Sequence, residues 1–168
     1  MSDVKDKKVR TEQILGMLKS AIGKSMPNVH RSPMVTSIFD GKIISAERGE
    51  VEVEFIVQPK MTNPLGLLHG GMQCTLMDDI IGITVATLGL ESFSISMNLQ
   101  INYLGKAKER DKIRVNAKVI REGKTVIHAT AKISHINGNI ISIGQSDLLR
   151  TQIDSDYIKS IMNNKKKN

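Results

Sequence analysis

The segment from Gly70 to about Leu88 most limits how this chain can fold. Its sequence, GGMQCTLMDDIIGITVATL, places apolar residues at nearly every turn of a helix. A helix that is apolar nearly all round has to be enclosed by other elements. The most apolar run, from Ile80 to Leu90, is interrupted by glycines and threonines and is too short to span a bilayer. We therefore expect about five turns of helix in the centre of the domain.

The C-terminal half alternates between apolar and polar residues, which predicts strands with one buried face. In SFSISMNLQINY the apolar residues are Phe93, Ile95, Met97, Leu99, Ile101 and Tyr103. DKIRVNAKVI and TVIHATAKIS repeat the pattern, and a last strand is expected from about Ile140 to Leu149. REGKT and NGN supply turns between these strands.

The N-terminal part predicts an amphipathic helix, TEQILGMLKSAIG, with Thr11 as its cap and its end near Gly23. Two strands joined by a turn at Arg48-Gly49 precede the apolar helix, and DYIKSIM predicts a short terminal helix. The fold class is therefore α+β, a curved and mostly antiparallel sheet wrapped around a long central helix. We expect an N-terminal helical extension (1–30), one domain (31–153), and a short helix with a basic tail (154–168).

Composition narrows the class of protein. The 168 residues include 40% hydrophobic and 24% charged residues, ordinary values for one soluble globular domain. Cys74 is the single cysteine, so no disulfide framework is possible, and without a secretory signal pattern we expect a cytoplasmic location. The net charge of +7 comes in part from the NNKKKN tail, and no nucleic-acid recognition motif accompanies it. No His/Cys/Asp cluster has metal-ligand spacing.

The start of the central helix has the features of an anion-binding site. Gly70 and Gly71 open the helix, so their N–H groups lack intrahelical acceptors. Asn63 adds a possible side-chain donor to this candidate oxyanion site, and His69 is placed to orient Asn63 or to contact a ligand. Pro/Gly turns before glycine-started helices are also common as plain structure, and a single His is more often structural.

Two adjacent acids inside the apolar helix, Asp78 and Asp79, need an explanation because burying an unpaired carboxylate is costly. One of them could be an exposed helix residue. Asp78 lies eight residues beyond Gly70, roughly 12 Å along the helix. The Gly70 N–H and the Asp78 carboxylate of one chain therefore cannot easily act on the same substrate carbonyl. If both are catalytic, two chains must meet with antiparallel helices, which predicts a dimer with two shared sites.

At these residues the sequence resembles the hotdog-fold acyl-CoA thioesterases, in the PaaI-like branch that includes the mammalian THEM2-type enzymes. NPLGLLHGGMQCTLMDD matches the pattern of that branch at Asn63, Gly66, His69, Gly70, Gly71 and Asp78. The resemblance runs from about Gly41 to Arg150 and includes SISMNLQINYL and the EGKT turn. The first thirty residues and the lysine tail lie outside it.

The resemblance implies roles for these residues. The Gly70 N–H and Asn63 polarise the thioester carbonyl, His69 supports Asn63, and Asp78 of the partner chain is the general base or the nucleophile. Ser96 matches a serine that helps to position the water. Alternation places Ser96 opposite Met97 and Leu99, so it points away from its own Asp78 if those two residues pack on the helix. A bulge or a cross-dimer contact would bring it to the site; otherwise it is only polar.

One segment departs from the family pattern. LGKAKERDKI lacks the usual proline, and Glu109-Arg110 stand where the family often has glycine. In the family this loop lies near the nucleotide end of CoA. The candidates for contacts with substrate are Gly71 and Tyr103 and, for the CoA phosphates, Lys106, Lys108, Arg110 and Lys124. Exposed basic residues without a ligand are an equally good interpretation of each single cation.

The sequence therefore predicts an acyl-CoA thioesterase that forms a homodimer or a dimer of dimers and needs no cofactor beyond the CoA of its substrate. A non-catalytic acyl-CoA sensor of the same fold is the main alternative, although a sensor needs neither Asp78 nor Asn63. A hotdog hydratase is less consistent with a histidine directly before the helix, and a nucleic-acid role rests only on the basic tail. With no Trp, two Tyr and three Phe, the chain favours aliphatic over aryl acyl groups.

Overall fold

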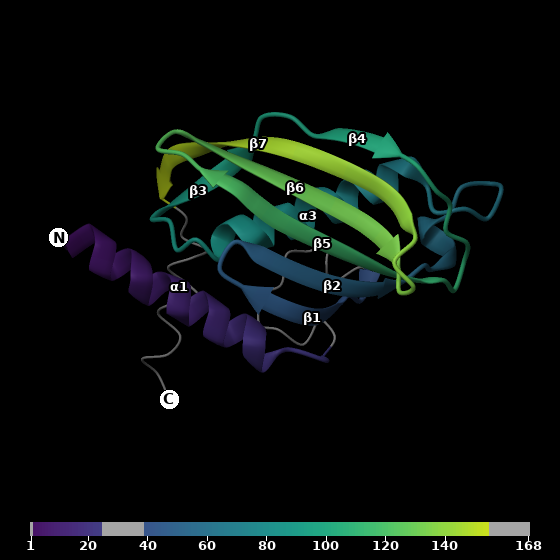
Figure 1. Cartoon of the computed structure of the whole chain (residues 1–168), viewed down its shortest axis with the longest axis horizontal. Coiled ribbons are helices and arrows are strands. Elements are labelled where there is room, and N and C mark those ends of the chain that lie inside the picture. The colour runs from purple at the N-terminus through teal and green to yellow at the C-terminus, as the bar shows by residue number, and fades with distance from the viewer. Residues whose placement is uncertain (1, 25–38, 155–168) are drawn as a thin grey trace.

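One curved sheet wraps around one helix in the computed structural model, which describes residues 2–24 and 39–154 (Figure 1). Every pairing between the named strands is antiparallel, in the order β1-β2-β5-β6-β7-β3, with β4 also on β7. This confirms the predicted α+β class. The elements are α1 (Ser2–Ser20), β1 (Lys42–Glu47), β2 (Glu50–Ile56), η2 (Pro59–Met61), α3 (Gly70–Ala86), β3 (Ser92–Ser96), β4 (Gln100–Tyr103), β5 (Lys112–Glu122), β6 (Val126–His135) and β7 (Ile140–Asp154).

Helix α3 packs into the concave face of the sheet, as the apolar segment predicted. The α3 side chains with at most 1% exposure are Leu76, Met77, Ile80 and Ile81, together with Thr84. The helix is not enclosed all round, however. Gly71, Asp78 and Gly82 are exposed on one strip of its surface. A Cβ added at Gly82 would meet no atom of the described residues within 4 Å. One strip of α3 therefore remains open in the single chain.

Strands β5 and β6 follow the predicted alternation. Seven of the eight residues predicted to point inward are at most 4% exposed: Ile113, Val115, Ala117, Ile127, Ala129, Ala131 and Ile133. The eighth, Val119, is only partly buried, next to an irregularity in the pairing of β5 with β6. The turns fall where predicted, and Gly138 has φ 91° between β6 and β7. Strand β7 runs to Asp154, beyond the predicted end at Leu149, because its C-terminal half also pairs with β3.

The strand predicted from Phe93 to Tyr103 is broken, and the prediction of one buried apolar face is wrong for its first half and for Tyr103 at its end. Strand β3 ends at Ser96, and β4 begins at Gln100. Ser96 pairs with Leu148 and Gln100 with Gln145, so three residues (97–99) lie opposite two (146–147), which is a β-bulge. The apolar side chains Phe93, Ile95, Met97 and Tyr103 are 44–53% exposed, whereas Leu99 and Ile101 pack against the core.

Helix α1 begins at Ser2, so Thr11 lies inside the helix, and the prediction that it is the N-cap is wrong. Ile14 and Leu18 of α1 are buried in the common core. The predicted helix DYIKSIM lies outside the described residues. No helix in residues 2–24 or 39–154 is long and apolar enough to cross a membrane.

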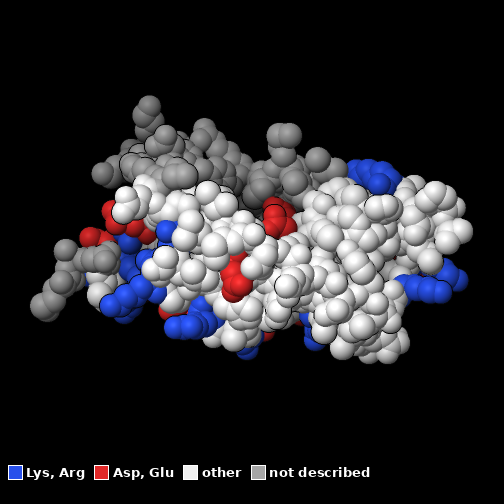
Figure 2. All heavy atoms as spheres, turned by 90° about the horizontal axis from the view of Figure 1, so that it is seen from above, with Lys and Arg blue, Asp and Glu red and all other residues white. Residues whose placement is uncertain are grey.

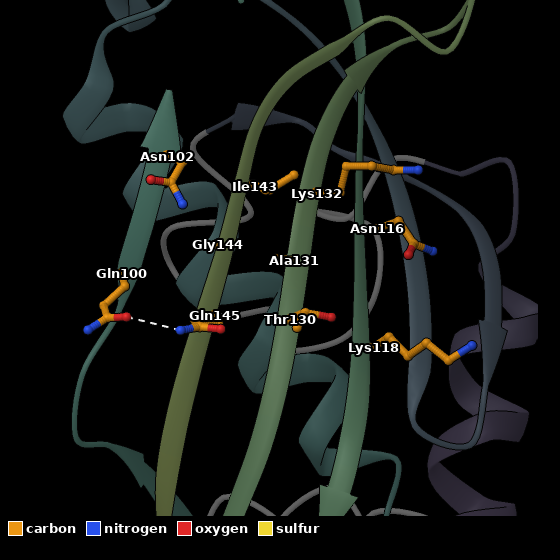
Figure 3. A pocket seen from close by; sticks show the side chains of 10 residues that line it. All are labelled: Gln100, Asn102, Asn116, Lys118, Thr130, Ala131, Lys132, Ile143, Gly144 and Gln145. Carbon is orange, nitrogen blue, oxygen red and sulfur yellow. Dashed lines mark hydrogen bonds between the residues drawn. The ribbon is translucent and has the colours of Figure 1, made fainter. Parts of the chain in front are cut away.

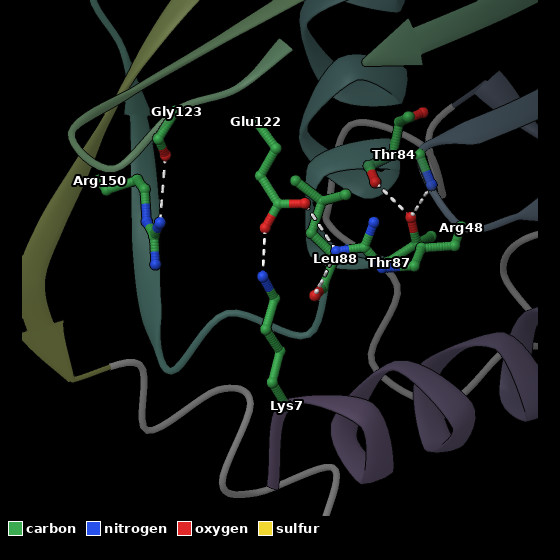
Figure 4. Close-up of polar contacts among 9 residues, drawn as sticks. Lys7, Arg48, Thr84, Thr87, Leu88, Glu122, Gly123 and Arg150 are labelled. Atoms are coloured by element: carbon green, nitrogen blue, oxygen red, sulfur yellow. Dashed lines mark hydrogen bonds and ion pairs between the residues drawn. The ribbon is translucent and has the colours of Figure 1, made fainter. Parts of the chain in front are cut away.

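Polar groups join α1 to the C-terminal end of α3 (Figure 4). Lys7 of α1 binds Glu122, which also accepts a hydrogen bond from Arg48 at 2.7 Å. Arg10 Nε donates to the Gly89 carbonyl at 2.9 Å, and the Thr87 hydroxyl accepts from the Gly49 N–H at 2.8 Å. The Arg10 bond gives a partner to a carbonyl just beyond the end of α3, where the helix supplies none.

Candidate active site

The loop before α3 is closed around Asn63. Its Oδ1 accepts hydrogen bonds from the N–H groups of Leu65 (2.9 Å) and Leu67 (3.2 Å), and its own N–H donates to the Leu67 carbonyl at 2.8 Å. Gly66, with φ 71°, makes the turn, because a side chain is strained in that conformation. Since the carbonyl oxygen of the Asn63 amide is occupied, the group that this residue can offer a ligand is its NH2.

His69 is the N-cap of α3. Its Nδ1 accepts from the Gly71 N–H at 2.9 Å, so this nitrogen is unprotonated in this arrangement. Among the described residues no hydrogen bond joins His69 to Asn63, and the predicted support of Asn63 by His69 gains no contact from the structure. The His69 bond occupies the Gly71 N–H, so Gly70 is the glycine of this pair whose N–H stays available at the helix start.

Tyr103 of β4 lies against this helix start. Its hydroxyl is 3.3 Å from the Gly70 carbonyl oxygen and 3.2 Å from the Cys74 sulfur. The contact with Cys74, followed by burial, raises the pKa of Tyr103. A Cβ at Gly70 would lie 3.4 Å from the Tyr103 ring. The tyrosine therefore closes one side of the helix start, and sequence reasoning did not foresee its contact with Cys74.

Asp78 and Ser96 of the same chain lie together. The Ser96 hydroxyl donates to Asp78 Oδ1 at 2.8 Å, and both side chains are exposed. Regular alternation would turn Ser96 away from its own Asp78; the bulge between β3 and β4, one of the two arrangements that the sequence left open, brings it there instead. The two groups form a carboxylate–hydroxyl pair on the open strip of α3. Both Gly70 and Asp78 belong to α3, roughly 12 Å apart along the helix axis.

Asp79, next along the helix, is half-buried, and its burial raises its pKa to about 7, with the Asp78 charge as the second cause. A carboxyl with this pKa is partly protonated at neutral pH. The sequence indicated that one of the two acids needed an explanation, but adjacency alone could not show that Asp78 is the exposed one.

The basic loop after β4 lies beside the Asn63 loop. The backbone of Lys108 forms an antiparallel β-bridge with that of Leu67, and the Leu68 N–H donates to the Ala107 carbonyl at 2.8 Å. The side chains of Lys106, Lys108 and Arg110 are exposed there. Lys124 lies in the β5–β6 turn instead, at the far end of an eleven-residue strand, which spans roughly 30 Å or more. One chain therefore does not bring Lys124 to the other three cations.

A cavity of about 440 Å³ lies elsewhere, on the outer face of the sheet, with α3 behind the strands (Figure 3). Its lining is mainly amide, hydroxyl and lysine side chains from β4, β5, β6 and β7, and it contains none of the predicted site residues. Within residues 2–24 and 39–154, no group of three or more His, Cys, Asp or Glu side chains is arranged to hold a metal ion.

Comparisons with known proteins agree on one family. A family model described as the thioesterase superfamily matches residues 65–142. Acyl-coenzyme A thioesterase 13 of Homo sapiens is 32% identical over 108 residues, which cover 62% of this chain and 77% of the human protein.

Two solved structures extend the likeness to the fold. Zebra fish thioesterase superfamily member 2 has a TM-score of 0.68 and 27% identity, covering 82% of this chain and 96% of that one. A hypothetical thioesterase protein of Streptococcus pneumoniae, solved with coenzyme A, has a TM-score of 0.64 and 25% identity, covering 68% of this chain and 91% of that one.

Proposed function

Because this chain belongs to the thioesterase superfamily, we propose that it hydrolyses acyl-CoA thioesters to a free acid and CoA. The observation that carries the proposal is the pair formed by Asp78 and Ser96 on the open strip of α3. A carboxylate that is exposed on an otherwise apolar helix and held by a hydroxyl is placed to accept a proton from water. The human relative named acyl-coenzyme A thioesterase 13 supports the substrate class.

In the proposed reaction, the Gly70 N–H and the Asn63 NH2 donate hydrogen bonds to the thioester carbonyl oxygen. Asp78 removes a proton from water, and the resulting hydroxide adds to the carbonyl carbon. Ser96 holds the carboxylate and the water in place. The tetrahedral intermediate then collapses, the carbon–sulfur bond breaks, and the CoA thiolate takes the proton from Asp78. The hydroxyl of the water thus ends on the acid and its proton on the thiol, and no cofactor is needed.

The proposed site is shared between two chains. Gly70 and Asp78 are too far apart on one α3 to contact the same thioester, whereas two antiparallel helices would bring Gly70 of one chain to Asp78 of the other. Gly71 and Gly82 leave the open strip of α3 without bulky side chains, which supports a close approach of a second backbone. We therefore propose a homodimer, and a dimer of dimers is compatible with the same arrangement.

The surface around the site supports this assembly. The open edge strand β3 presents the exposed apolar side chains Phe93 and Ile95. Seen from above, the face with β7 and β4 uppermost is largely uncharged, with acidic groups near its middle and basic residues toward its ends (Figure 2). An apolar edge strand that stays unpaired is a liability in a single chain, and pairing with a second copy would remove it.

The substrate is proposed to lie along this surface in two parts. Lys106, Lys108 and Arg110 would contact the phosphates of CoA, because their loop lies beside the Asn63 loop. The acyl chain would pass between the two α3 helices near Gly71 and Tyr103. Lys124 would reach the nucleotide only if another chain supplied it. The small number of aromatic residues favours an aliphatic acyl group, and a cytoplasmic location stays a prediction of the sequence.

The first experiment measures thiol release from short, medium, long and aryl acyl-CoAs by wild type, Asp78→Ala and Asn63→Ala. We expect wild type to turn over, and Asp78→Ala to lose on the order of 10²-fold or more in kcat, as for loss of a general base. Glu12→Ala, which removes an exposed carboxylate of α1, serves as the control and should keep wild-type kcat. Wild type that binds acyl-CoA without releasing thiol would instead identify a sensor.

A further inference from the structure

The bulge between β3 and β4 sets the direction in which Ser96 points. Ser96 reaches Asp78 on α3, and Leu99 packs against the same core. These two residues are three positions apart, and in a regular strand an odd separation places side chains on opposite faces. They share the inner face here because the bulge adds one residue between them. Without that extra residue, the strand could not direct both Ser96 and Leu99 toward α3.

Asn98 holds the bulge to β7. Its Oδ1 accepts from the Asp147 N–H at 3.1 Å, and its Nδ2 donates to Asp147 Oδ2 at 3.0 Å. The neighbouring backbone adds two bonds, from the Met97 N–H to the Asp147 carbonyl at 2.8 Å and from the Ser146 hydroxyl to the Asn98 carbonyl at 2.6 Å. The amide of Asn98 therefore takes the place of ladder bonds that the bulge interrupts.

His128 completes the network from the next strand. It stands opposite Asp147 in the β6–β7 pairing, and its Nδ1 is 2.8 Å from Asp147 Oδ1. The hydrogen bond from Asn98, followed by that from His128, lowers the pKa of Asp147, so the carboxylate is ionised at neutral pH. An ionised carboxylate only accepts, which places a proton on His128 Nδ1. Each Asp147 oxygen thus has its own donor.

We propose that Asn98, held by Asp147 and His128, is the positioning residue that directs Ser96 to Asp78. This inference rests on the proposed thioesterase function. The side chain of Asn98 binds Asp147, which lies on the outer side of the sheet beside its cross-strand neighbour His128. Asn98 therefore contacts no proposed reacting group. Its effect reaches the site through the backbone of residues 96–99. The role of Asn98 is geometric, because it maintains the extra residue that turns the Ser96 hydroxyl inward.

The test compares Asn98→Leu, which keeps the side-chain size and removes both amide contacts, in wild-type and Ser96→Ala backgrounds. If Asn98 acts through Ser96, Asn98→Leu lowers kcat about tenfold or more with KM within about twofold. In the Ser96→Ala background the same substitution then lowers kcat by less than about twofold, because the group it positions is gone. Equal losses in both backgrounds, or a loss confined to KM, would overturn the inference.

Asn102→Leu is the matched control. Asn102 is an asparagine of β4 that pairs with Ile143 of β7 and lines the outer cavity, outside the bulge that contains Asn98. Its substitution should leave kcat within about twofold. A crystal structure of the Asn98→Leu chain gives a readout that needs no activity. We expect the bond from Ser96 to Asp78 to be broken, and finding it intact would contradict the inference even if wild type hydrolysed no thioester.

Discussion

At the scale of single residues, the sequence was a better guide to which positions form the candidate site than to where their side chains point. Asn63, Gly70 and Asp78 could be singled out because an amide, two helix-starting glycines and an acid in an apolar helix each need a reason. The direction of Ser96 could not, because alternation is a rule for regular strands and a single inserted residue reverses it. The contact proposed to hold this extra residue in place joins Asn98 to Asp147, two residues 49 positions apart.

Asp79 gives a prediction about pH and stability. Its pKa is raised from 3.8 to about 7 in the folded chain, so between these values the folded state holds a proton that the unfolded state has lost. The free energy of unfolding therefore falls as the pH rises through this window. Asp79→Asn removes the titration, and its Tm should exceed that of wild type by a margin that grows from pH 5 to pH 8. A margin independent of pH would contradict this.

At the scale of elements, the strands buried on one face were predicted well because their neighbours on both sides enforce the alternation. The prediction failed at the edge, where β3 and β4 each pair only with β7 among the described strands and side chains can face solvent. It also failed at the start of α1, because Thr11 resembles an N-cap in sequence while its backbone continues the helix that begins at Ser2. The domain limits proposed at residues 31 and 153 stay a prediction, although Ile14 and Leu18 of α1 lie in the common core.

Gly89 provides a test of how α1 is attached. It has φ 68°, and a Cβ there would lie 2.5 Å from the Lys7 carbonyl oxygen and 2.5 Å from Thr11 Oγ1. Gly89→Ala should cost about 1–2 kcal/mol for the backbone and about 1–3 kcal/mol more for the overlap. Because the overlap is with α1, amide exchange of residues 7–18 should become faster.

Gly49→Ala is the control for this experiment. Gly49 has φ 78°, but a Cβ there would meet Val119 at an ordinary 3.6 Å. It should therefore show the backbone cost alone and leave the exchange of α1 unchanged. If the two variants lose the same stability and α1 exchanges equally slowly in both, the close contact at Gly89 does not hold α1 in place.

At the scale of the whole molecule, a single chain holds the two parts of the proposed site at separate positions along α3. The Asn63 loop, Gly70 and the basic loop lie at one end of α3, and Asp78 with Ser96 lies further along the same helix. The length of α3 could be predicted from the sequence, and the proposal of a second chain follows from that length. The position of Lys124 at the other end of the sheet could not, because the path of the chain through β5 separates it from the other cations.

The most direct measurement for the shared site mixes two inactive variants, Asn63→Ala and Asp78→Ala, under conditions that let subunits exchange. Each mixed dimer would carry one site with both residues intact and one site lacking both. Since about half of the dimers are mixed at equal concentrations, thiol release should recover to about a quarter of the wild-type rate. If the mixture stays as inactive as its components while native mass spectrometry shows that mixed dimers have formed, Asn63 and Asp78 do not act across two chains.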